Sequence, residues 1–224
     1  MLSEKPAVVF FDMDHTVISI DCDVSWKYFL SSEGLAPASD CAKADHFLEI
    51  YHKGESSCEE FVEFQLHEFI GNTENEMQEL AQRHFESAVR KTVYPSAQLE
   101  IENLLTLDIP IVLLTGTNRI IAEPVARLLG MSDLIATELE ILDERFTGKI
   151  IEPYLMKEGK VKLADEYCSA NHTSLNEAVF YADSITDVPL LEKVGRPVVI
   201  NPNGKKLLEW AKSRKWRIEH WSLN

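Results

Sequence analysis

The feature of this sequence that most constrains its fold is a set of short apolar runs that alternate with segments of helical spacing. Runs of this kind, rich in Val, Ile and Phe, are typical of strands buried on both faces, as in a parallel sheet. Helices that connect parallel strands make right-handed crossovers and cover both faces of the sheet. The sequence therefore predicts an α/β fold with a doubly wound parallel sheet, whose strands are expected at 6–11, 109–115, 134–137, 178–182 and 197–200.

Helices are expected between these strands, and two of them are followed by a glycine, which is a common helix stop. Residues 139–151 predict a β-hairpin with its turn near Asp143. The four expected helices lie at 96–107, 118–129, 160–169 and 187–194.

The stretch from residue 20 to residue 90 interrupts the alternation, because it contains only helical periodicities. Four helices in a row after the first strand predict an inserted α-helical cap domain. The expected division is a core of residues 1–18 plus 92–224 and a cap of residues 19–91. The aromatic stripe of the third helix is more typical of a buried core than of a cofactor site. The apolar positions that define the four helices are Trp26, Phe29 and Leu30; Phe47, Leu48 and Tyr51; Phe61, Phe64 and Phe69; Met77, Leu80 and Phe85.

The 224-residue chain is strongly acidic, with a formal net charge of −15. Residues 20–90 contain 15 Asp+Glu against 5 Lys+Arg, so most of the excess lies in the insertion. This charge predicts that neither nucleic acid nor an anionic membrane is a partner. No apolar run approaches the roughly 18 residues that a membrane span needs. The N-terminal residues do not resemble a signal peptide, so a cytoplasmic location is expected.

Asp12 and Asp14 directly follow the first apolar run. Residues i and i+2 of a strand point the same way, so the two carboxylates are expected to lie together. Such a pair is costly to ionise unless a cation lies between the carboxylates, and Mg²⁺, a hard ion that prefers oxygen ligands, meets that need. The alternative is a capped turn with two solvated carboxylates.

Two further polar groups follow other strands. Thr115-Gly116-Thr117 follows the second strand, and its hydroxyls and N–H groups are suited to hold phosphate oxygens or simply to cap the next helix. Asp183 and Asp187 follow the fourth strand, where Asp187 could instead be a helix N-cap. All of these groups are expected at the same edge of the sheet, where ligands of doubly wound folds bind.

Lys160 lies at the expected start of a helix. A lysine is unfavourable beside the positive end of the helix dipole unless an anion is near. The alternative is a solvated surface lysine, and Lys157 and Lys162 compete for the same role. Together with the strand-end groups, Lys160 predicts a site for a metal and a phosphoryl group.

These residues resemble the motifs of the haloacid dehalogenase-like hydrolases, and more narrowly the phosphoserine phosphatase-like branch, over almost the whole chain. The first motif, D-x-D-x-T, is matched by Asp12–Thr16, and the second by Thr115. The third motif is matched by Lys160 and the fourth by Asp183–Asp187. The helical insertion matches the cap of that branch.

The resemblance implies a phosphoric monoester hydrolase with a two-step reaction. Asp12 would attack phosphorus and form an aspartyl-phosphate, while Asp14 would protonate the leaving oxygen and then activate water. Mg²⁺ would be held by Asp12, the backbone carbonyl of Asp14, Asp183 and Asp187. The residues implied to bind the substrate or neutralise its phosphoryl oxygens are Lys160, Thr115, Gly116 and Thr117.

The sequence also departs from the family pattern. His15 and Thr186 stand where relatives commonly have a small residue and Asn. Asp21 stands where the branch has a cap acid for the substrate's amino group, but no Arg or Lys occurs between Lys53 and Arg83, where the cap Arg for a substrate carboxylate is expected. We hypothesise that the substrate is a small phosphorylated metabolite that carries an amine or hydroxyls and is not phosphoserine.

Three alternatives stay open on the sequence alone. The chain could be a phosphoserine phosphatase proper, or a phosphotransferase whose acceptor is not water. A receiver-type phosphoacceptor domain also combines Asp, Thr and Lys on a doubly wound sheet, although it has no helical insertion. The sequence does not predict an oligomeric state.

Overall fold

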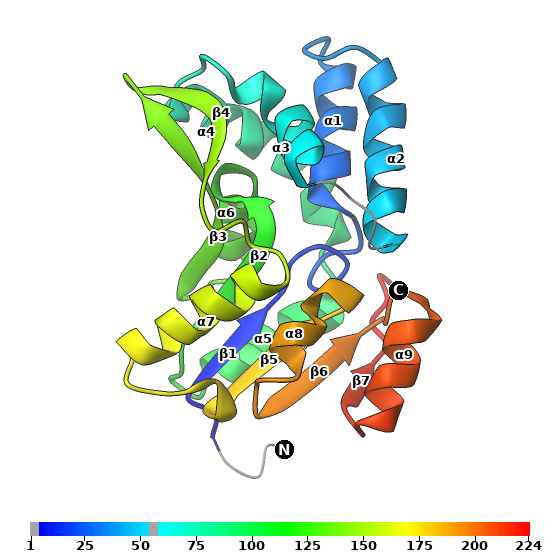
Figure 1. Cartoon of the computed structure of the whole chain (residues 1–224), viewed down its shortest axis with the longest axis vertical. Helices are drawn as coiled ribbons and strands as arrows, with labels where there is room; N and C mark the ends of the chain where they lie inside the picture. The colour runs from blue at the N-terminus through cyan, green and yellow to red at the C-terminus, as the bar shows by residue number, and fades with distance from the viewer. Residues whose placement is uncertain (1–4, 54–57) are drawn as a thin grey trace.

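The computed structural model describes residues 5–53 and 58–224. Its strands are β1 (Val8–Phe11), β2 (Ile111–Asn118), β3 (Asp133–Leu142), β4 (Arg145–Ile151), β5 (Ala178–Ala182), β6 (Arg196–Ile200) and β7 (Arg217–Glu219). Within the described residues these seven strands form one sheet in the order β4-β3-β2-β1-β5-β6-β7 (Figure 1). All neighbouring strands pair in parallel except β3 and β4. The predicted doubly wound α/β fold is confirmed.

Helices cover both faces of the sheet. Those that follow the insertion are α5 (Pro95–Leu105), α6 (Arg119–Leu128), α7 (Glu158–Ala170), α8 (Val188–Leu191) and α9 (Gly204–Ser213). Val9 and Phe11 of β1 belong to the apolar cluster under α5 and α6, whereas Val8 and Phe10 belong to the cluster under α7, α8 and α9. Figure 1 shows α7 and α8 in front of the sheet and α5 behind it. Because both faces are covered, every position of β1 is apolar.

The predicted helical insertion after β1 is confirmed. Among the described residues it contains α1 (Cys22–Ser32), α2 (Ser39–Lys53), α3 (Cys58–Leu66) and α4 (Glu74–His84), and α4 continues into a π-helical turn at Phe85–Val89. Trp26 and Phe69 are buried in the same apolar cluster as Phe11 of the sheet. The expected apolar position Tyr51 has a side chain outside the described residues. None of the described helices combines the length and the apolar composition needed to cross a membrane.

The chain enters and leaves the insertion through two adjacent segments. Ile18 and Val93 form an isolated antiparallel bridge, and Ser19 N donates to Thr92 O at 2.9 Å. These residues lie next to the expected boundaries between core and cap. The division of the chain into these two domains stays a prediction.

The β3–β4 hairpin connects the sheet to the insertion. Its turn residues, Asp143 and Glu144, both have positive φ, as the favoured two-residue hairpin turn requires. At its tip, Phe146 N donates to Asn72 O at 2.9 Å and Gly71 N donates to Phe146 O at 2.9 Å. The hairpin is therefore bonded to the segment that joins α3 to α4.

Some element boundaries differ from the expected ones. The strand expected at 134–137 and the first arm of the expected hairpin are one continuous strand, β3. β2 runs to Asn118, beyond its expected end at residue 115, and its pairing with β3 is irregular between Leu114 and Asn118. α9 and β7 were not predicted, because only Leu207 and Ala211 of α9 are buried and β7 has three residues.

Candidate active site

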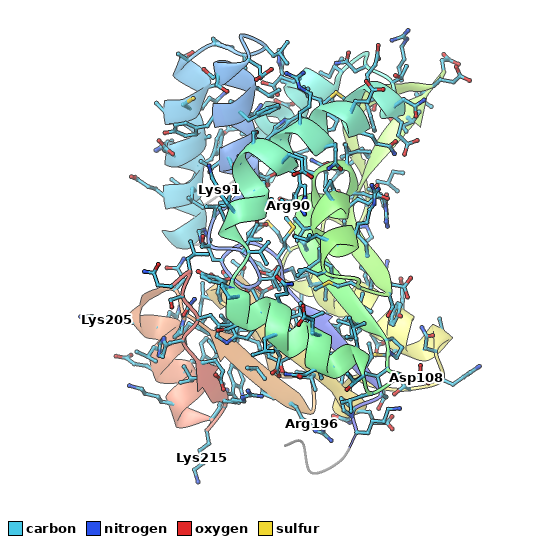
Figure 2. All side chains as sticks on the ribbon, turned by 180° about the vertical axis from the view of Figure 1, so that it is seen from behind. Arg90, Lys91, Asp108, Arg196, Lys205 and Lys215 are labelled. Carbon is cyan, nitrogen blue, oxygen red and sulfur yellow. The ribbon has the colours of Figure 1, made fainter. Side chains whose placement is uncertain are left out.

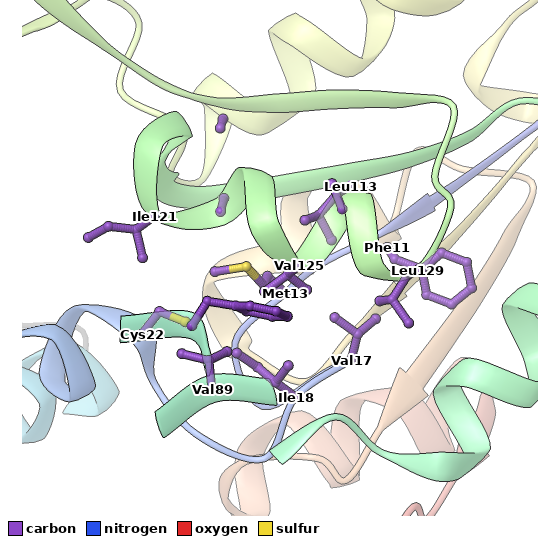
Figure 3. Packing of buried hydrophobic residues seen from close by; sticks show 14 of the residues in the cluster. Phe11, Met13, Val17, Ile18, Cys22, Val89, Leu113, Ile121, Val125 and Leu129 are labelled. Carbon is purple, nitrogen blue, oxygen red and sulfur yellow. The ribbon is translucent and has the colours of Figure 1, made fainter. Parts of the chain in front are cut away.

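The candidate active site lies at the carboxyl ends of β1 and β5. In the loop after β1, Met13 is buried in the apolar cluster that contains Val125 of α6 (Figure 3). The flanking Asp12 and Asp14 line a cavity of about 80 Å³. Asp12 N donates to Tyr181 O at 2.9 Å, which fixes the start of the loop against β5. Because the Met13 side chain is buried in the core, the side chains before and after it in the chain, Asp12 and Asp14, face the cavity.

Lys160, near the start of α7, is the lysine that reaches these carboxylates. Its Nζ donates to Asp12 Oδ1 at 2.6 Å and forms an ion pair with Asp187 Oδ1 at 2.7 Å, and all three side chains are buried. Lys162, by contrast, is exposed and lies 3.9 Å from Glu166 on the outer side of the same helix. The structure therefore brings Lys160 into the site.

Asp12, Asp183 and Asp187 form a buried cluster in which carboxylate oxygens lie within 4.8 Å of one another. Burial, together with the charges of Asp12 and Asp187, raises the pKa of Asp183 well above its ordinary value. Burial also raises the pKa of Asp187 to about 6, although Lys160 opposes this shift. The Thr16 hydroxyl contacts two of the acids, Asp12 at 3.2 Å and Asp183 at 3.3 Å. Three carboxylates beside one lysine fit a divalent cation with oxygen ligands.

Asp14 has different surroundings from Asp12. Its Oδ1 accepts from Cys22 N at 2.7 Å, and its Oδ2 accepts from the Thr117 hydroxyl at 2.7 Å. Burial and the nearby charges of Asp21 and Asp12 raise its pKa well above the ordinary value. Asp14 therefore holds a proton more readily than an exposed aspartate. Its carboxylate is not part of the three-acid cluster.

The end of β2 brings two of its three predicted substrate-binding residues to the cavity. Gly116 and Thr117 line the cavity, whereas Thr115 is fully buried and is not among the lining residues. The Thr115 hydroxyl accepts from Thr117 N at 3.1 Å, and the Thr137 hydroxyl donates to Gly116 O at 2.6 Å. These bonds hold the irregular end of β2. The phosphate-binding roles of the three residues stay predictions.

Asp21 reaches the cavity from the start of α1. Its Oδ1 accepts from Val24 N at 2.8 Å, so Asp21 is also the N-cap of this helix. Asp23, which the sequence analysis did not single out, lines the cavity as well. Burial and the charge of Asp21 raise the pKa of Asp23 to about 7. The role of Asp21 as a substrate ligand stays a prediction.

The cavity also has an apolar wall that sequence analysis missed. Phe47 of α2 and Phe61 of α3 line it, together with the loop Tyr154–Met156 before α7. Phe64 and Phe69 are buried in the core, as expected for the aromatic stripe, but Phe61 faces the cavity. Helical periodicity identifies positions that face inward, and it does not distinguish a packed core from a cavity wall.

Positive charge is scarce inside the cavity. Lys160 is the single Lys or Arg among the lining residues of the described chain. Lys205 and Lys215 are exposed and project outward (Figure 2). His15 and Thr186, the two departures from the family motifs, both line the cavity.

Comparison with known proteins gives the family of this chain. The sequence profile of the haloacid dehalogenase-like hydrolases matches residues 9–192. A histidinol-phosphatase from Neisseria meningitidis serogroup C is 28% identical over 216 residues, which cover 94% of this chain and 97% of the relative. A protein of unknown function from Bordetella pertussis Tohama I has a TM-score of 0.86 at 31% identity, covering 99% of this chain and 100% of that one. A phospho-aspartyl intermediate analogue of phosphoserine phosphatase has a TM-score of 0.70 at 15% identity, with 96% and 93% covered, and is similar in fold.

The matched region contains the whole cluster from Asp12 to Asp187. Because the matching family consists of hydrolases, the receiver-type alternative that the sequence left open is no longer needed. The chain belongs to the haloacid dehalogenase-like hydrolases.

Proposed function

We propose that this enzyme is a magnesium-dependent phosphatase that hydrolyses a small phosphate monoester through an aspartyl-phosphate on Asp12. The observation that carries the proposal is the contrast between two neighbouring carboxylates. Asp12 contacts Lys160 at 2.6 Å, whereas Asp14 accepts from a backbone N–H and a hydroxyl. The Lys160 ammonium is a partner for the Asp12 carboxylate, whereas burial beside like charges raises the pKa of Asp14 and favours its protonated form. The pair therefore divides into a nucleophile and a general acid.

The reaction has two steps. In the first, an Asp12 oxygen forms a bond to phosphorus while the bond to the ester oxygen breaks, and Asp14 gives its proton to the leaving oxygen. In the second, water attacks the phosphorus of the aspartyl-phosphate and Asp14 takes a proton from that water. Inorganic phosphate then leaves, Asp12 is again a carboxylate, and Asp14 is again protonated.

Charge on the phosphoryl oxygens must be stabilised during both steps, because this supplies most of the catalysis in phosphoryl transfer. We assign this role to Lys160 and to the β2 residues Thr115, Gly116 and Thr117. Mg²⁺ fits the buried acids Asp12, Asp183 and Asp187, and the backbone carbonyl of Asp14 is the further ligand that we propose. The ion, when bound, would neutralise phosphoryl charge.

The substrate is proposed to carry a cationic nitrogen and no carboxylate. Asp21 and Asp23 place two acidic side chains on the helical side of the cavity, and Lys160 is already paired with two acids. Histidinol phosphate, for which the Neisseria meningitidis relative is named, carries an ammonium group and an imidazole. An ester of this type suits the cavity better than phosphoserine, whose carboxylate would face the acids.

Hydrolysis of p-nitrophenyl phosphate tests the proposal. The wild-type enzyme should be active with Mg²⁺ and should lose its activity in EDTA. Asp12→Asn should lower kcat by about 10⁴-fold or more, because the nucleophile is removed. Asp165→Asn, an equivalent change at an exposed position of α7, should leave kcat unchanged.

Equal release of p-nitrophenol and inorganic phosphate would separate hydrolysis from transfer to another acceptor. Activity that does not depend on Mg²⁺, or that persists in Asp12→Asn, would contradict the proposed mechanism.

A further inference from the structure

We infer that Thr117 is a positioning residue of the reaction, whose hydroxyl holds the Asp14 carboxyl group in the orientation that delivers a proton to the leaving oxygen. The inference rests on the proposed function, in which Asp14 is the general acid. It gives Thr117 a role different from the contact with phosphoryl oxygens that was proposed for the three β2 residues together. The two roles predict different effects on esters whose leaving groups differ in basicity.

The Asp14 carboxyl group is held between the sheet and the insertion. Thr117, at the end of β2, donates its hydroxyl hydrogen to Asp14 Oδ2 at 2.7 Å, and Cys22 N, at the start of α1, donates to Oδ1 at 2.7 Å. Thr117 is 3% exposed and Cys22 is fully buried, so bulk water has little access to either bond. Rotation of the carboxyl group about its Cβ–Cγ bond would break both bonds. The two donors therefore fix the orientation of the Asp14 oxygens.

Both hydrogen-bond donors of Thr117 are used within the chain. Its hydroxyl hydrogen goes to Asp14, and its backbone N–H donates to the Thr115 hydroxyl at 3.1 Å. A threonine hydroxyl carries a single hydrogen, so it cannot serve Asp14 and a phosphoryl oxygen as a full donor at the same time. The short contact favours the general acid, rather than the phosphoryl group, as the partner of Thr117.

The strand end that carries Thr117 is held by a second hydroxyl. The pairing of β2 with β3 shifts between Leu114 and Asn118, so Thr117 lies in the irregular part of the strand. Within this part, the buried Thr137 hydroxyl of β3 donates to Gly116 O at 2.6 Å. Loss of the Thr137 hydroxyl would thus disturb the strand end but leave the hydroxyl that bonds to Asp14 in the protein.

The orientation of Asp14 matters most when the leaving group needs a proton. Phenolate and alkoxide ions are poor leaving groups, so the general acid must give them a proton as the P–O bond breaks. The p-nitrophenolate ion is stabilised by its nitro group and departs readily without that proton. A misplaced Asp14 should therefore slow the hydrolysis of phenyl phosphate far more than that of p-nitrophenyl phosphate, although the two esters share the same ring.

The test compares kcat/KM for phenyl phosphate with kcat/KM for p-nitrophenyl phosphate, because kcat/KM covers only the steps up to formation of the aspartyl-phosphate. Thr117→Val keeps the shape of the side chain and removes the hydroxyl. It should lower the phenyl phosphate value roughly tenfold to thirtyfold, which is part of the roughly 10²–10⁴-fold that a general acid contributes. The p-nitrophenyl phosphate value should fall by less than about threefold. Thr117→Ser, which keeps a hydroxyl, should retain the wild-type ratio.

Two controls separate positioning from a structural effect. Thr137→Val removes a buried hydroxyl that bonds to Gly116 O at the same strand end, so any loss should be equal for the two esters. Asp14→Asn should show a selective loss on phenyl phosphate at least as large as that of Thr117→Val. Adding Thr117→Val to Asp14→Asn should change the ratio little, because the effects of residues that act as a unit are not additive.

An equal loss on both esters in Thr117→Val would mean that the hydroxyl contacts phosphoryl oxygens or only stabilises the fold, and it would overturn the inference. No loss on either ester would overturn it as well. If Thr117→Val does not fold, Thr117→Ala takes its place in the same comparison. These outcomes leave the phosphatase proposal intact. The absence of Mg²⁺-dependent hydrolysis of both esters by the wild type would instead overturn the proposed function itself.

Discussion

At the scale of single residues, the site depends on what lies beside each carboxylate. Asp12 and Asp14 are two positions apart and line one cavity, but only Asp12 has a lysine as a hydrogen-bond partner in the described structure. Burial raises the pKa of Asp14, Asp183 and Asp187. Lys160 is therefore the residue whose removal should most change the electrostatics of the cluster.

Lys160→Met is expected to lower kcat/KM for p-nitrophenyl phosphate by about 10²–10³-fold, because one preorganised cation is lost from the phosphoryl site. Steady-state kinetics, with circular dichroism to verify folding, would measure this. Lys162→Met is the matched control, since Lys162 is exposed on the same helix, and it should retain wild-type kinetics. A Lys160→Met enzyme within tenfold of the wild type would contradict the assignment of Lys160 to phosphoryl charge.

The buried His84 should make the free energy of unfolding depend on pH. Its ring is buried against Trp26 and Phe29, its Nε2 lies 2.9 Å from Ser25 Oγ, and burial lowers its pKa from 6.5 to about 4. The folded protein thus favours the neutral ring. This contribution is complete above pH 6.5 and is lost as the pH falls toward 4. The difference between the two pKa values corresponds to about 3 kcal/mol.

Urea unfolding of the wild type and His84→Gln at several pH values would measure this contribution. The free energy of unfolding of the wild type should fall relative to that of His84→Gln between pH 6.5 and 4. Comparing the two proteins cancels the buried aspartates, whose raised pKa values act in the opposite direction. Parallel pH curves for the two proteins would show that His84 is not held neutral.

At the scale of elements, the start of α7 fixes one wall of the cavity. Gly159 lies directly before Lys160, and a Cβ at Gly159 would overlap the carbonyl oxygen of Tyr154. The loop that contains Tyr154 therefore approaches the helix as closely as a glycine allows. That approach holds the cavity-lining loop and the lysine in a fixed relation.

Gly159→Ala is expected to separate the loop from α7, with a loss of about 1–3 kcal/mol from overpacking. It should also lower kcat/KM, because small displacements of catalytic groups are costly. Thermal unfolding and p-nitrophenyl phosphate kinetics would measure both effects. Ser169→Ala, at the exposed end of the same helix, should change neither. Unchanged stability and kinetics in Gly159→Ala would show that the loop is not fixed by this contact.

At the scale of the whole molecule, the insertion and the sheet share one apolar cluster. Trp26 and Phe69 of the insertion belong to the same cluster as Phe11 and Leu113 of the sheet. Phe146 of the hairpin packs edge to face on Phe69, with ring centroids 5.4 Å apart. Continuous packing of this kind predicts that the insertion and the sheet unfold together.

Phe146→Ala should therefore destabilise the whole molecule by about 3–5 kcal/mol. Two single-tryptophan proteins, one retaining Trp26 in α1 and one retaining Trp210 in α9, would report the two regions in urea. Both probes should move to the same lower midpoint in the variant. A shift seen only at Trp26 would show that the insertion unfolds separately.

Much of this organisation follows from the sequence, for identifiable physical reasons. The strands β1 and β5 are buried on both faces, so their residues are apolar throughout and visible as runs. Asp12, Lys160 and Asp187 could be grouped because parallel strands bring their carboxyl ends to one edge.

The cavity walls could not be predicted in the same way. Asp23 and Phe61 come from two helices of the insertion, and a helical period does not show how two helices meet. The continuity of β3 was also hidden, since only the middle of the strand is buried whereas both of its ends are exposed.

The hydrogen bonds between the hairpin tip and the α3–α4 connection have a consequence for protein engineering. Substrate range in such an enzyme is an attractive target for chimeras, in which the insertion of one relative replaces that of another. If only the segment between Ile18 and Val93 is replaced, Phe146 loses its native contacts with Phe69, Gly71 and Asn72 and meets residues of the other protein instead. A graft that also includes β3 and β4 would keep these contacts. The unit to be exchanged therefore consists of two segments that are separate in the sequence.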